Sequence, residues 1–347
     1  MPTMSRRRTL LGVASIIAAP SIVRAQGAVT QLRFTLDIQV QGVHAFYYLA
    51  REKGYLREEG IELVIDQGEG SAAVTSRVMS GAYDAGFGDI NAIIEMAAKR
   101  PGEAPQMVYQ YYNRPPFALI VKASSPIKTL KDFEGHTVGA PAGAATVRLL
   151  PLLAKLNGVD PSRITLSNMQ SKLQEQLFLQ DQVDALASYD NNLYFNLAIL
   201  GKNPDRDFRW FRYGDFGLNL YANGVMVSRK LLKEKPDKVA GLVRAINRAT
   251  RDVAADLNVG MATLMKAEPL LNERIEKQRL EWCFKNSFTS AETDRNGFGD
   301  IDDVRFSGAI DQVTTAFGLT RKPEPSDIFN RSFLPPKMER DFKLTST

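Results

Sequence analysis

Cysteine and histidine are scarce in this chain of 347 residues, which has one Cys and two His. A single cysteine excludes an intramolecular disulfide framework and any metal or iron–sulfur site that needs several thiolates. Two histidines leave little material for a His-rich metal centre, so the sequence predicts neither a metal site nor a bound cofactor. Common catalytic motifs are missing as well: there is no Gly-x-Ser-x-Gly elbow, no phosphate-binding loop, no dinucleotide-binding glycine pattern and no His-Glu-x-x-His.

Net charge is also small in the chain after residue 25. Lys and Arg number 44 against 39 Asp and Glu, a formal net charge of +5. Residues 1–25 hold four arginines and no acidic residue, so the rest of the chain carries only +1. Proteins that bind nucleic acid keep clusters of basic residues interleaved with aromatic ones. No such cluster remains after residue 25, and we expect no nucleic-acid partner.

Residues 1–25 have the order of a secretory signal peptide: a head with three arginines, an apolar run over residues 10–19 and a small-residue exit at Ala25. The apolar run has ten residues, about half of what a membrane-spanning helix needs. Arg6 and Arg7 also resemble a twin-arginine export signal, so both export routes stay open. No cysteine lies near the predicted cleavage site, which excludes a lipoprotein anchor. No later apolar run approaches 18 residues, so we predict an exported, periplasmic and soluble protein.

The remaining chain alternates predicted strands and helices. Residues 32–36, 44–59 and 61–65 read as strand, helix and strand, which predicts a right-handed β-α-β unit and a parallel sheet. A second set of the same kind begins at His136, and the late chain looks helical. Its strongest element is an amphipathic helix over residues 236–257, whose apolar face holds Val239, Leu242, Val243, Ile246, Ala249 and Val253.

This order predicts an α/β fold of two lobes that close on a cleft, as a clamshell does. Lobe 1 would comprise residues 30–118 and 222–335, and lobe 2 residues 119–221. Two hinge strands, at residues 117–121 and 218–227, would cross between the lobes.

Ligands of open α/β sheets bind beyond the carboxyl ends of strands, where helices begin. Four segments of the sequence meet that description: residues 37–47, 70–72, 88–91 and 143–146. Glycine-led helix starts leave backbone N–H groups free for a carboxylate, sulfonate, nitrate or carbonyl oxygen, although each can equally be a plain helix cap. The predicted ligand-binding residues are Asp37, Gln39, His44, Tyr47, Gly70, Ser71, Ala72, Asp89, Asn113, Gly143, Ala144, Thr146, Tyr189, Asp190, Asn191 and Tyr221.

Several of these residues have a structural alternative. Asp89 can act as a helix cap and His44 as a capping or core histidine. At least one of Tyr109, Tyr111 and Tyr112 is expected to line the cleft. The lone cysteine, Cys283, has no neighbouring base in the sequence and is expected to be a packing residue.

The chain resembles the NMT1/THI5-like family within the nitrate- and taurine-type periplasmic binding proteins. Nearly the whole mature chain takes part, through residues 34–37, 44–50, 53–63, 80–88, 130–135, 138–139, 235–239 and 255–256. The resemblance implies a type II periplasmic binding protein, a monomer that serves an ABC importer and delivers its ligand to a membrane permease. It favours a pyrimidine of the thiamine-precursor kind or another small heteroaromatic ligand. Sulfonates, taurine, nitrate and aromatic carboxylates stay open.

The same family contains fungal thiamine-pyrimidine synthases, which are enzymes on this fold. The resemblance implies that those enzymes need a lysine for pyridoxal phosphate and a reactive histidine, where this chain has Gly88 and Ala92. They also need a cysteine cluster, where residues 218–224 here contain no cysteine. We therefore predict a binding protein and no catalytic residue. An exported enzyme built on Cys283 or His44, and a ligand sensor for a signalling receptor, are the alternatives.

Overall fold

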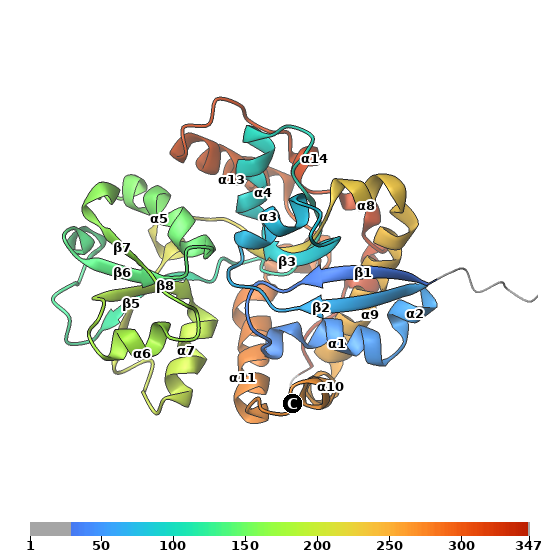
Figure 1. The fold of residues 1–347 in the computed structure, drawn as a ribbon, viewed down its shortest axis with the longest axis horizontal. Helices are drawn as coiled ribbons and strands as arrows, with labels where there is room; N and C mark the ends of the chain where they lie inside the picture. Colours follow the sequence, from blue (N-terminus) through green and yellow to red (C-terminus); the bar gives the residue numbers. More distant parts are fainter. Residues whose placement is uncertain (1–28, 346–347) are drawn as a thin grey trace, which may run out of the picture.

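Two five-stranded sheets, each flanked by helices, form two lobes in the computed structural model, which describes residues 29–345 (Figure 1). The predicted signal peptide at residues 1–25 lies outside the described residues. The first sheet has the strand order β2-β1-β3-β10-β4, and the second has the order β7-β6-β8-β5-β9. The predicted two-lobe α/β clamshell is confirmed.

The strands of the first sheet are β1 (Thr30–Thr35), β2 (Ile61–Asp66), β3 (Ala85–Asp89), β4 (Gln106–Gln110) and β10 (Asn223–Val227). Those of the second are β5 (Phe117–Lys122), β6 (Thr137–Ala140), β7 (Thr165–Asn168), β8 (Ala185–Tyr189) and β9 (Phe208–Arg212). The helices before β4 are η1 (Gly42–His44), α1 (Ala45–Glu52), α2 (Tyr55–Glu58), α3 (Ala73–Met79) and α4 (Ile90–Lys99). Between β5 and β10 lie η2 (Leu130–Phe133), α5 (Ala145–Leu156), η3 (Pro161–Arg163), α6 (Gln174–Leu179), α7 (Asp190–Ile199) and η4 (Tyr213–Phe216).

The chain after β10 is helical, as expected. It forms α8 (Arg229–Glu234), α9 (Pro236–Ala255), α10 (Leu257–Ala267), α11 (Glu273–Cys283), η5 (Phe284–Phe288), α12 (Ala291–Asn296), α13 (Asp303–Ala316), α14 (Pro325–Ile328), η6 (Arg331–Phe333) and α15 (Lys337–Arg340). The apolar face predicted for α9 is fully buried and packs on α1 and α2. Among residues 29–345 no helix is both long and apolar enough to cross a membrane.

Both sheets are mixed, which corrects the expectation of a parallel sheet. β1 pairs in parallel with β2 and β3, as the β-α-β pattern predicts. However, β10 runs antiparallel to β3 and β4, and β5 runs antiparallel to β8 and β9. Each of these two strands enters its sheet from the other lobe. The right-handed crossover through a helix, which enforces parallel pairing, therefore does not apply to them.

The first predicted hinge strand does not cross between the lobes, and only residues 218–222 of the second do. β5 lies wholly in the second sheet, so the boundary expected at residues 118–119 falls inside a strand, and β10 lies wholly in the first sheet. The crossings are residues 111–116 and 217–222. They run side by side, since Tyr112 N–H donates to Asn223 O at 2.9 Å and Ala222 N–H to Tyr112 O at 3.2 Å. Pro115 and Pro116 lack an N–H group, which ends this ladder before it becomes a strand.

The first predicted helix is divided into two. α1 ends at Glu52 and α2 begins at Tyr55, with Gly54 between them at φ 76°. That left-handed conformation suits glycine and breaks the helical hydrogen-bond pattern. Gly60, also left-handed at φ 65°, then ends the unit as predicted.

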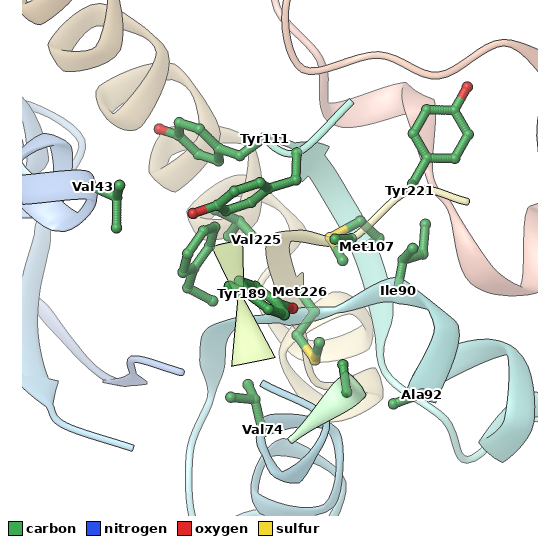
Figure 2. Packing of buried hydrophobic residues seen from close by; sticks show 14 of the residues in the cluster. Val43, Val74, Ile90, Ala92, Met107, Tyr111, Tyr189, Tyr221, Val225 and Met226 are labelled. Atoms are coloured by element: carbon green, nitrogen blue, oxygen red, sulfur yellow. The ribbon is translucent and has the colours of Figure 1, made fainter. Parts of the chain in front are cut away.

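An aromatic core fills lobe 1 beneath the hinge. Tyr111 and Val225 belong to one buried cluster, part of which is drawn in Figure 2. The ring of Tyr111 packs 5.0 Å from Phe46 and 5.7 Å from Phe87, centre to centre. This rigid layer supports the strand ends that face the second lobe.

Candidate functional site

A cavity lies between the two lobes at the carboxyl ends of β1 and β8. Its empty space measures ≈ 540 Å³, part of which opens to solvent. The cavity is lined by Asp37, Ile38, Gln39, Gln41, Gly70, Ser71, Pro141, Ala144, Thr146, Ser171, Gln174, Ser188, Tyr189, Asn192 and Asn196. Residues before 72 come from lobe 1 and the rest from lobe 2. Both lobes therefore contribute to one site, as the strand-end argument predicts.

The two glycine-led helix starts meet across the cleft. Ala72 N–H, before α3, donates a hydrogen bond of 3.1 Å to Gly143 O, before α5. Gly70 has φ 141°, and a Cβ atom on it would lie 2.3 Å from the Gly143 carbonyl carbon. Only glycine permits this approach of two backbones. The two glycine-led helix starts that the sequence indicates therefore lie on opposite sides of the cleft.

Tyr189 joins the lobes through its hydroxyl group. From the end of β8, the hydroxyl donates a 2.6 Å hydrogen bond to Asn223 Oδ1 and is hydrogen-bonded to Ser71 Oγ at 3.0 Å. Both partners belong to lobe 1. Burial raises the pKa of Tyr189 well above its ordinary value, so the hydroxyl keeps the proton that it donates.

Behind Tyr189 the hydrogen bonds continue into lobe 1. Asn223 Nδ2 donates to Asp37 Oδ2 at 2.8 Å, and His44 Nε2 lies 2.9 Å from Asp37 Oδ1. Gln41 N–H donates to His44 Nδ1 at 3.0 Å. Because Nδ1 accepts that bond, the proton of the neutral imidazole belongs on Nε2, where it is donated to Asp37.

The positions of Asp37 and His44 relative to the cavity disfavour catalysis by the histidine. Asp37 lines the cavity, whereas His44 is completely buried behind it. A histidine that takes a proton from a substrate must face the substrate, with the carboxylate behind. Here the arrangement is reversed, so His44 orients Asp37 and the turn at Gln41.

Three buried polar atoms of the cavity wall have no hydrogen-bond partner among residues 29–345: Gln41 Oε1, Thr146 Oγ1 and Gln174 Oε1. Their side chains are 9%, 0% and 4% exposed. A buried polar group without a partner costs about 1–3 kcal/mol, and such groups in native proteins usually have one. The cavity therefore holds polar groups that a ligand would satisfy.

Seven predicted site residues line this cavity: Asp37, Gln39, Gly70, Ser71, Ala144, Thr146 and Tyr189. The other nine lie outside its lining: His44, Tyr47, Ala72, Asp89, Asn113, Gly143, Asp190, Asn191 and Tyr221. Ala72 and Gly143 form the interlobe backbone contact, and Gly143 lines the adjoining outer groove. Tyr47 is buried against Phe34, with ring centres 4.7 Å apart.

The acids and amides outside the lining have structural partners. Asn91 Nδ2 donates to Asp89 Oδ1 at 2.8 Å, and burial raises the pKa of Asp89 to about 7. Asp89 occupies the position before α4, but its side chain makes no capping hydrogen bond. Arg212 Nε donates to Asp190 Oδ2 at 3.0 Å, while burial raises the pKa of Asp190 to about 6. Asn191 Nδ2 donates to the hydroxyl of Tyr112 at 3.3 Å.

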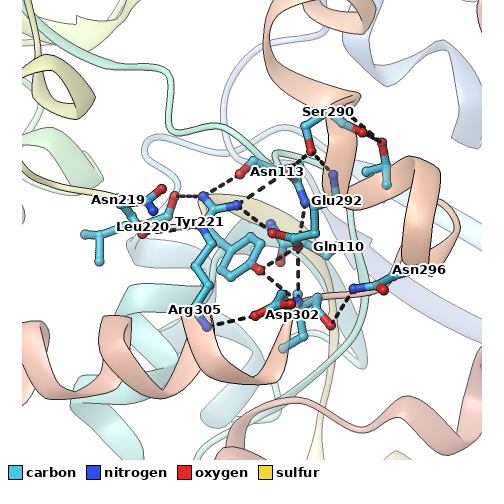
Figure 3. Close-up of polar contacts among 12 residues, drawn as sticks. Gln110, Asn113, Asn219, Leu220, Tyr221, Ser290, Glu292, Asn296, Asp302 and Arg305 are labelled. Atoms are coloured by element: carbon cyan, nitrogen blue, oxygen red, sulfur yellow. Dashed lines mark hydrogen bonds and ion pairs between the residues drawn. The ribbon is translucent and has the colours of Figure 1, made fainter.

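Asn113 and Tyr221 belong to a separate polar cluster at the hinge (Figure 3). Asn113 Nδ2 donates to Glu292 Oε1 at 2.9 Å, and the Tyr221 hydroxyl donates to the same oxygen at 2.6 Å. Arg305 forms an ion pair with Glu292 at 3.0 Å and lies over the Tyr221 ring. Glu292 and Arg305 come from α12 and α13, far along the sequence. These contacts fix the crossing segments and keep both residues from the cavity.

None of the three hinge tyrosines lines the cavity, contrary to expectation. Tyr109 donates to Asn247 Oδ1 at 2.7 Å, and the Tyr111 hydroxyl is 2.6 Å from Thr250 Oγ1. The Tyr112 ring packs 4.8 Å from Phe288. The helices that follow β10 supply these partners and bury all three rings, so Tyr189 is the one aromatic residue among the fifteen that line the cavity.

Eight lining residues are not among the sixteen predicted ligand-binding residues. They are Ile38, Gln41, Pro141, Ser171, Gln174, Ser188, Asn192 and Asn196. Ile38 and Gln41 lie within the predicted segment 37–47, and Asn192 belongs to the polar cluster of residues 189–192 that the strand-end argument favoured. Gln174 and Asn196 lie in α6 and α7, where no glycine or strand end marks them.

Cys283 is buried in α11, as expected of a packing residue. Burial raises the pKa of its thiol far above the ordinary value, which keeps it protonated and a poor nucleophile. Among residues 29–345 no group of three or more His, Cys, Asp and Glu side chains is placed to hold a metal ion.

The two mixed sheets and the interlobe cavity define the class as the periplasmic-binding-protein fold. The alkanesulfonate-binding protein SsuA from Xanthomonas axonopodis pv. citri, solved with MOPS bound, has this fold. It is similar to our chain with a TM-score of 0.63 at 18% identity, over 87% of this chain and 98% of that one.

Within that class, the sequence profile described as "NMT1/THI5 like" matches residues 41–256. The chain belongs to the NMT1/THI5-like family. A riboflavin-binding protein, RibY of Chloroflexus aurantiacus, is 27% identical over 69% of this chain, which spans 66% of that relative's length. The 4-amino-5-hydroxymethyl-2-methylpyrimidine phosphate synthase of Schizosaccharomyces pombe is 22% identical, and the match covers 73% of this chain and 74% of the synthase. The family's relatives thus include both binding proteins and enzymes.

The pyridoxal phosphate that the resemblance assigns to the synthases does not fit here. The place of its lysine is Gly88, in β3. A Cβ atom there would lie 2.6 Å from Val74 Cβ and 2.8 Å from Ser71 O. No lysine side chain can be accommodated without displacing α3, so we derive no step through that cofactor.

Proposed function

We propose that this protein is the substrate-binding component of an ABC importer. After export, the two lobes would capture a small organic molecule in the interlobe cavity and present the closed form to a membrane permease. The observation that carries the proposal is the interlobe cavity, which is built from strand ends of both lobes and contains buried polar groups without partners among the described residues. Family membership supports it, as do the relatives whose names describe ligand binding.

The contacts proposed for the ligand are the lining residues that lie at helix starts and strand ends. These are Asp37, Gln39, Ser71, Ala144, Thr146 and Tyr189, which the sequence also predicted. A pyrimidine of the thiamine-precursor kind, another small heteroaromatic compound and a small anion are the ligand classes carried forward. We propose that the protein acts as a monomer, because each chain contains both walls of the cavity.

An exported enzyme is the second possibility, since synthases share the family. It is disfavoured by the buried, protonated Cys283 and by His44, which lies behind Asp37. Substrate turnover that is lost on Cys283→Ala would support the enzyme. A sensor would use the same cavity and would differ in its membrane partner.

Native mass spectrometry of protein purified from its own periplasm tests the proposal. We expect one small molecule bound to one chain, and an N-terminus that begins after the predicted signal peptide. Adding that molecule to ligand-free protein should raise the melting temperature, because ligand at 100 times its dissociation constant stabilises by about 2.7 kcal/mol. X-ray scattering should then report a smaller radius of gyration. Absence of any bound molecule, together with no stabilisation across a metabolite library, would refute the binding function.

A further inference from the structure

Positive charge is missing from the cavity wall. None of the fifteen lining residues, all within the described part of the chain, is Lys, Arg or His. Three arginines on α5, β9 and α11 are already paired: Arg148 with Glu95, Arg212 with Asp190 and Arg279 with Glu276. Lys172 lines the adjoining outer groove together with Glu69 and is not among the residues that line the cavity itself. An anionic group entering the cavity would therefore lose its hydration without gaining a cation.

The one charged side chain in the wall is a carboxylate whose oxygens are occupied. Asp37 Oδ1 accepts from His44 Nε2 and from Ile38 N–H, each at 2.9 Å. Asp37 Oδ2 accepts from Asn223 Nδ2 at 2.8 Å. The carboxylate is thus satisfied by the protein and adds negative potential to the cavity. That potential opposes a second anion.

The unpartnered atom of Gln174 is an acceptor, and its orientation is fixed by a neighbour. Gln174 Nε2 donates to Glu175 Oε1 at 3.1 Å, and Asn196 Nδ2 donates to the same oxygen at 2.8 Å. A flipped Gln174 amide would place its oxygen against this carboxylate, which is repulsive. Oε1 of Gln174 is therefore left for the cavity, buried and without a donor.

Thr146 complements this acceptor from the start of α5. Its hydroxyl is fully buried, has no partner in the described part of the chain, and can donate as well as accept. The first hydrogen bond within α5 runs from Arg148 N–H to Ala144 O, so the preceding N–H groups have no partner within the helix. These N–H groups would suit any acceptor atom of the ligand. The Asp37 carboxylate in the same wall disfavours a full negative charge there, so a carbonyl oxygen or ring nitrogen fits this end of the cavity best.

From these observations we infer that the ligand is uncharged and donates an N–H or O–H group to Gln174 Oε1, while it accepts from the Thr146 end. Amides, ureides and amino- or oxo-substituted nitrogen heterocycles have this pattern. Sulfonates, phosphates and carboxylates do not. The inference rests on the proposed binding function and narrows its ligand class.

Two pairs of compounds that differ only in a phosphate group test the charge requirement by calorimetry. They are 4-amino-5-hydroxymethyl-2-methylpyrimidine with its phosphate ester, and riboflavin with riboflavin 5′-phosphate; MOPS serves as a sulfonate. We expect the neutral member of at least one pair to bind about 100-fold more tightly than its phosphate, because a buried charge here has no counterion. Equal or tighter binding of a phosphate or of MOPS would overturn the inference while leaving the binding function intact.

If none of these compounds binds, the molecule co-purified from the periplasm provides the test. An anion would overturn the inference, and a neutral molecule with an N–H or O–H donor would support it. Absence of any bound molecule would count against the binding function itself.

Variants test the hydrogen bonds separately from the fold. Thr146→Val replaces the unpartnered hydroxyl by a methyl group of similar size. We expect affinity for the neutral ligand to fall about tenfold, while the melting temperature of the ligand-free protein is unchanged or higher. Gln174→Leu should lower affinity to a similar degree, and the control Gln176→Leu, on the exposed side of α6, should leave it unchanged. Full affinity in both Thr146→Val and Gln174→Leu would refute the assigned contacts.

Discussion

At the scale of single residues, buried carboxyl groups set the pH response of this protein. Asp89 is 2% exposed, and among the described residues it accepts a hydrogen bond from Asn91 and has no cationic partner in direct contact. Burial raises its pKa to about 7, whereas an unfolded aspartate titrates near about 4. The folded protein therefore keeps a proton on Asp89 in a range where the unfolded chain has lost it.

The sign of the effect follows from proton linkage. Below about pH 4 the carboxyl group is protonated in both the folded and the unfolded state, so it does not change the unfolding free energy with pH. As pH rises from about 4 to about 7, the folded state loses stability relative to the unfolded state, up to about 4 kcal/mol in total. Asp89→Asn removes that loss and keeps an oxygen to accept from Asn91. We expect the variant to match the wild type at pH 4 and to exceed its unfolding free energy at pH 8.

Urea unfolding of both proteins across this pH range provides the measurement. Asp237→Asn, which changes an exposed carboxylate at the start of α9, is the matched control. It should leave the pH dependence of stability as it is in the wild type. A constant difference between Asp89→Asn and wild type at pH 4 and pH 8 would contradict the assignment.

The local sequence determines the surroundings of some site residues but not of others. Gly70, Ser71 and Thr146 were predictable because glycine-led helix starts are short-range signals. Asn113 and Tyr221 were not, since their surroundings depend on Glu292 and Arg305, which arrive from α12 and α13. The acceptor on Gln174 was also not predictable. Its environment depends on the packing of α6 against α7 and β8, which no local pattern encodes.

At the scale of elements, Arg279 of α11 holds helices of different lobes together. Its guanidinium is 1% exposed and donates to the carbonyl oxygens of Asn191 and Asn192, at the start of α7, at 3.0 and 3.3 Å. It also pairs with Glu276 at 3.0 Å, whose other contact is Gly42 N–H at 2.6 Å. A cation near a helix N-terminus is unfavourable to the helix dipole, so these carbonyl contacts and Glu276 must offset that cost.

Removing one partner of this buried pair should lower the unfolding free energy far more than removing both. Arg279→Met leaves the Glu276 carboxylate buried without its cation, and we expect a loss of about 3–5 kcal/mol in unfolding free energy. The double variant Arg279→Met with Glu276→Gln should recover a large part of that loss. A double-mutant cycle from urea unfolding measures the coupling. Additive effects of the two substitutions would mean that the pair does not act as a unit.

Elements themselves were mostly predictable, and the exceptions have physical causes. The β-α-β pattern and the apolar face of α9 follow from local periodicity, and both are observed. The first hinge crossing was misplaced because the continuous apolar run of residues 117–121 indicates a strand but not which sheet that strand joins. Pro115 and Pro116 end the crossing segment, and only then does β5 begin.

At the scale of the whole molecule, the structure has its lobes in contact around the cavity. The contacts are of different kinds: a backbone hydrogen bond from Ala72 to Gly143, hydroxyl bonds of Tyr189, and the buried Arg279. Each is weak enough to break individually, at about 1–3 kcal/mol net. A ligand that satisfies Gln174 and Thr146 would add its binding energy to this closed arrangement and shift the population towards it.

Gly70 offers the sharpest test of that closure, because its substitution acts on the approach of the lobes. In Gly70→Ala the new methyl group would lie 2.3 Å from the backbone of Gly143, which backbone atoms cannot relieve while the lobes stay together. We expect the ligand-bound variant to keep a larger radius of gyration than the wild type in X-ray scattering and to bind more weakly. Gly81→Ala, at φ 77° with nothing within 4 Å of the added atom, imposes only backbone strain of about 1–2 kcal/mol and should close normally. If Gly70→Ala contracts on ligand binding as fully as Gly81→Ala, the contact between Gly70 and Gly143 does not limit closure, and the ligand would have to be held with the cleft more open than it is here.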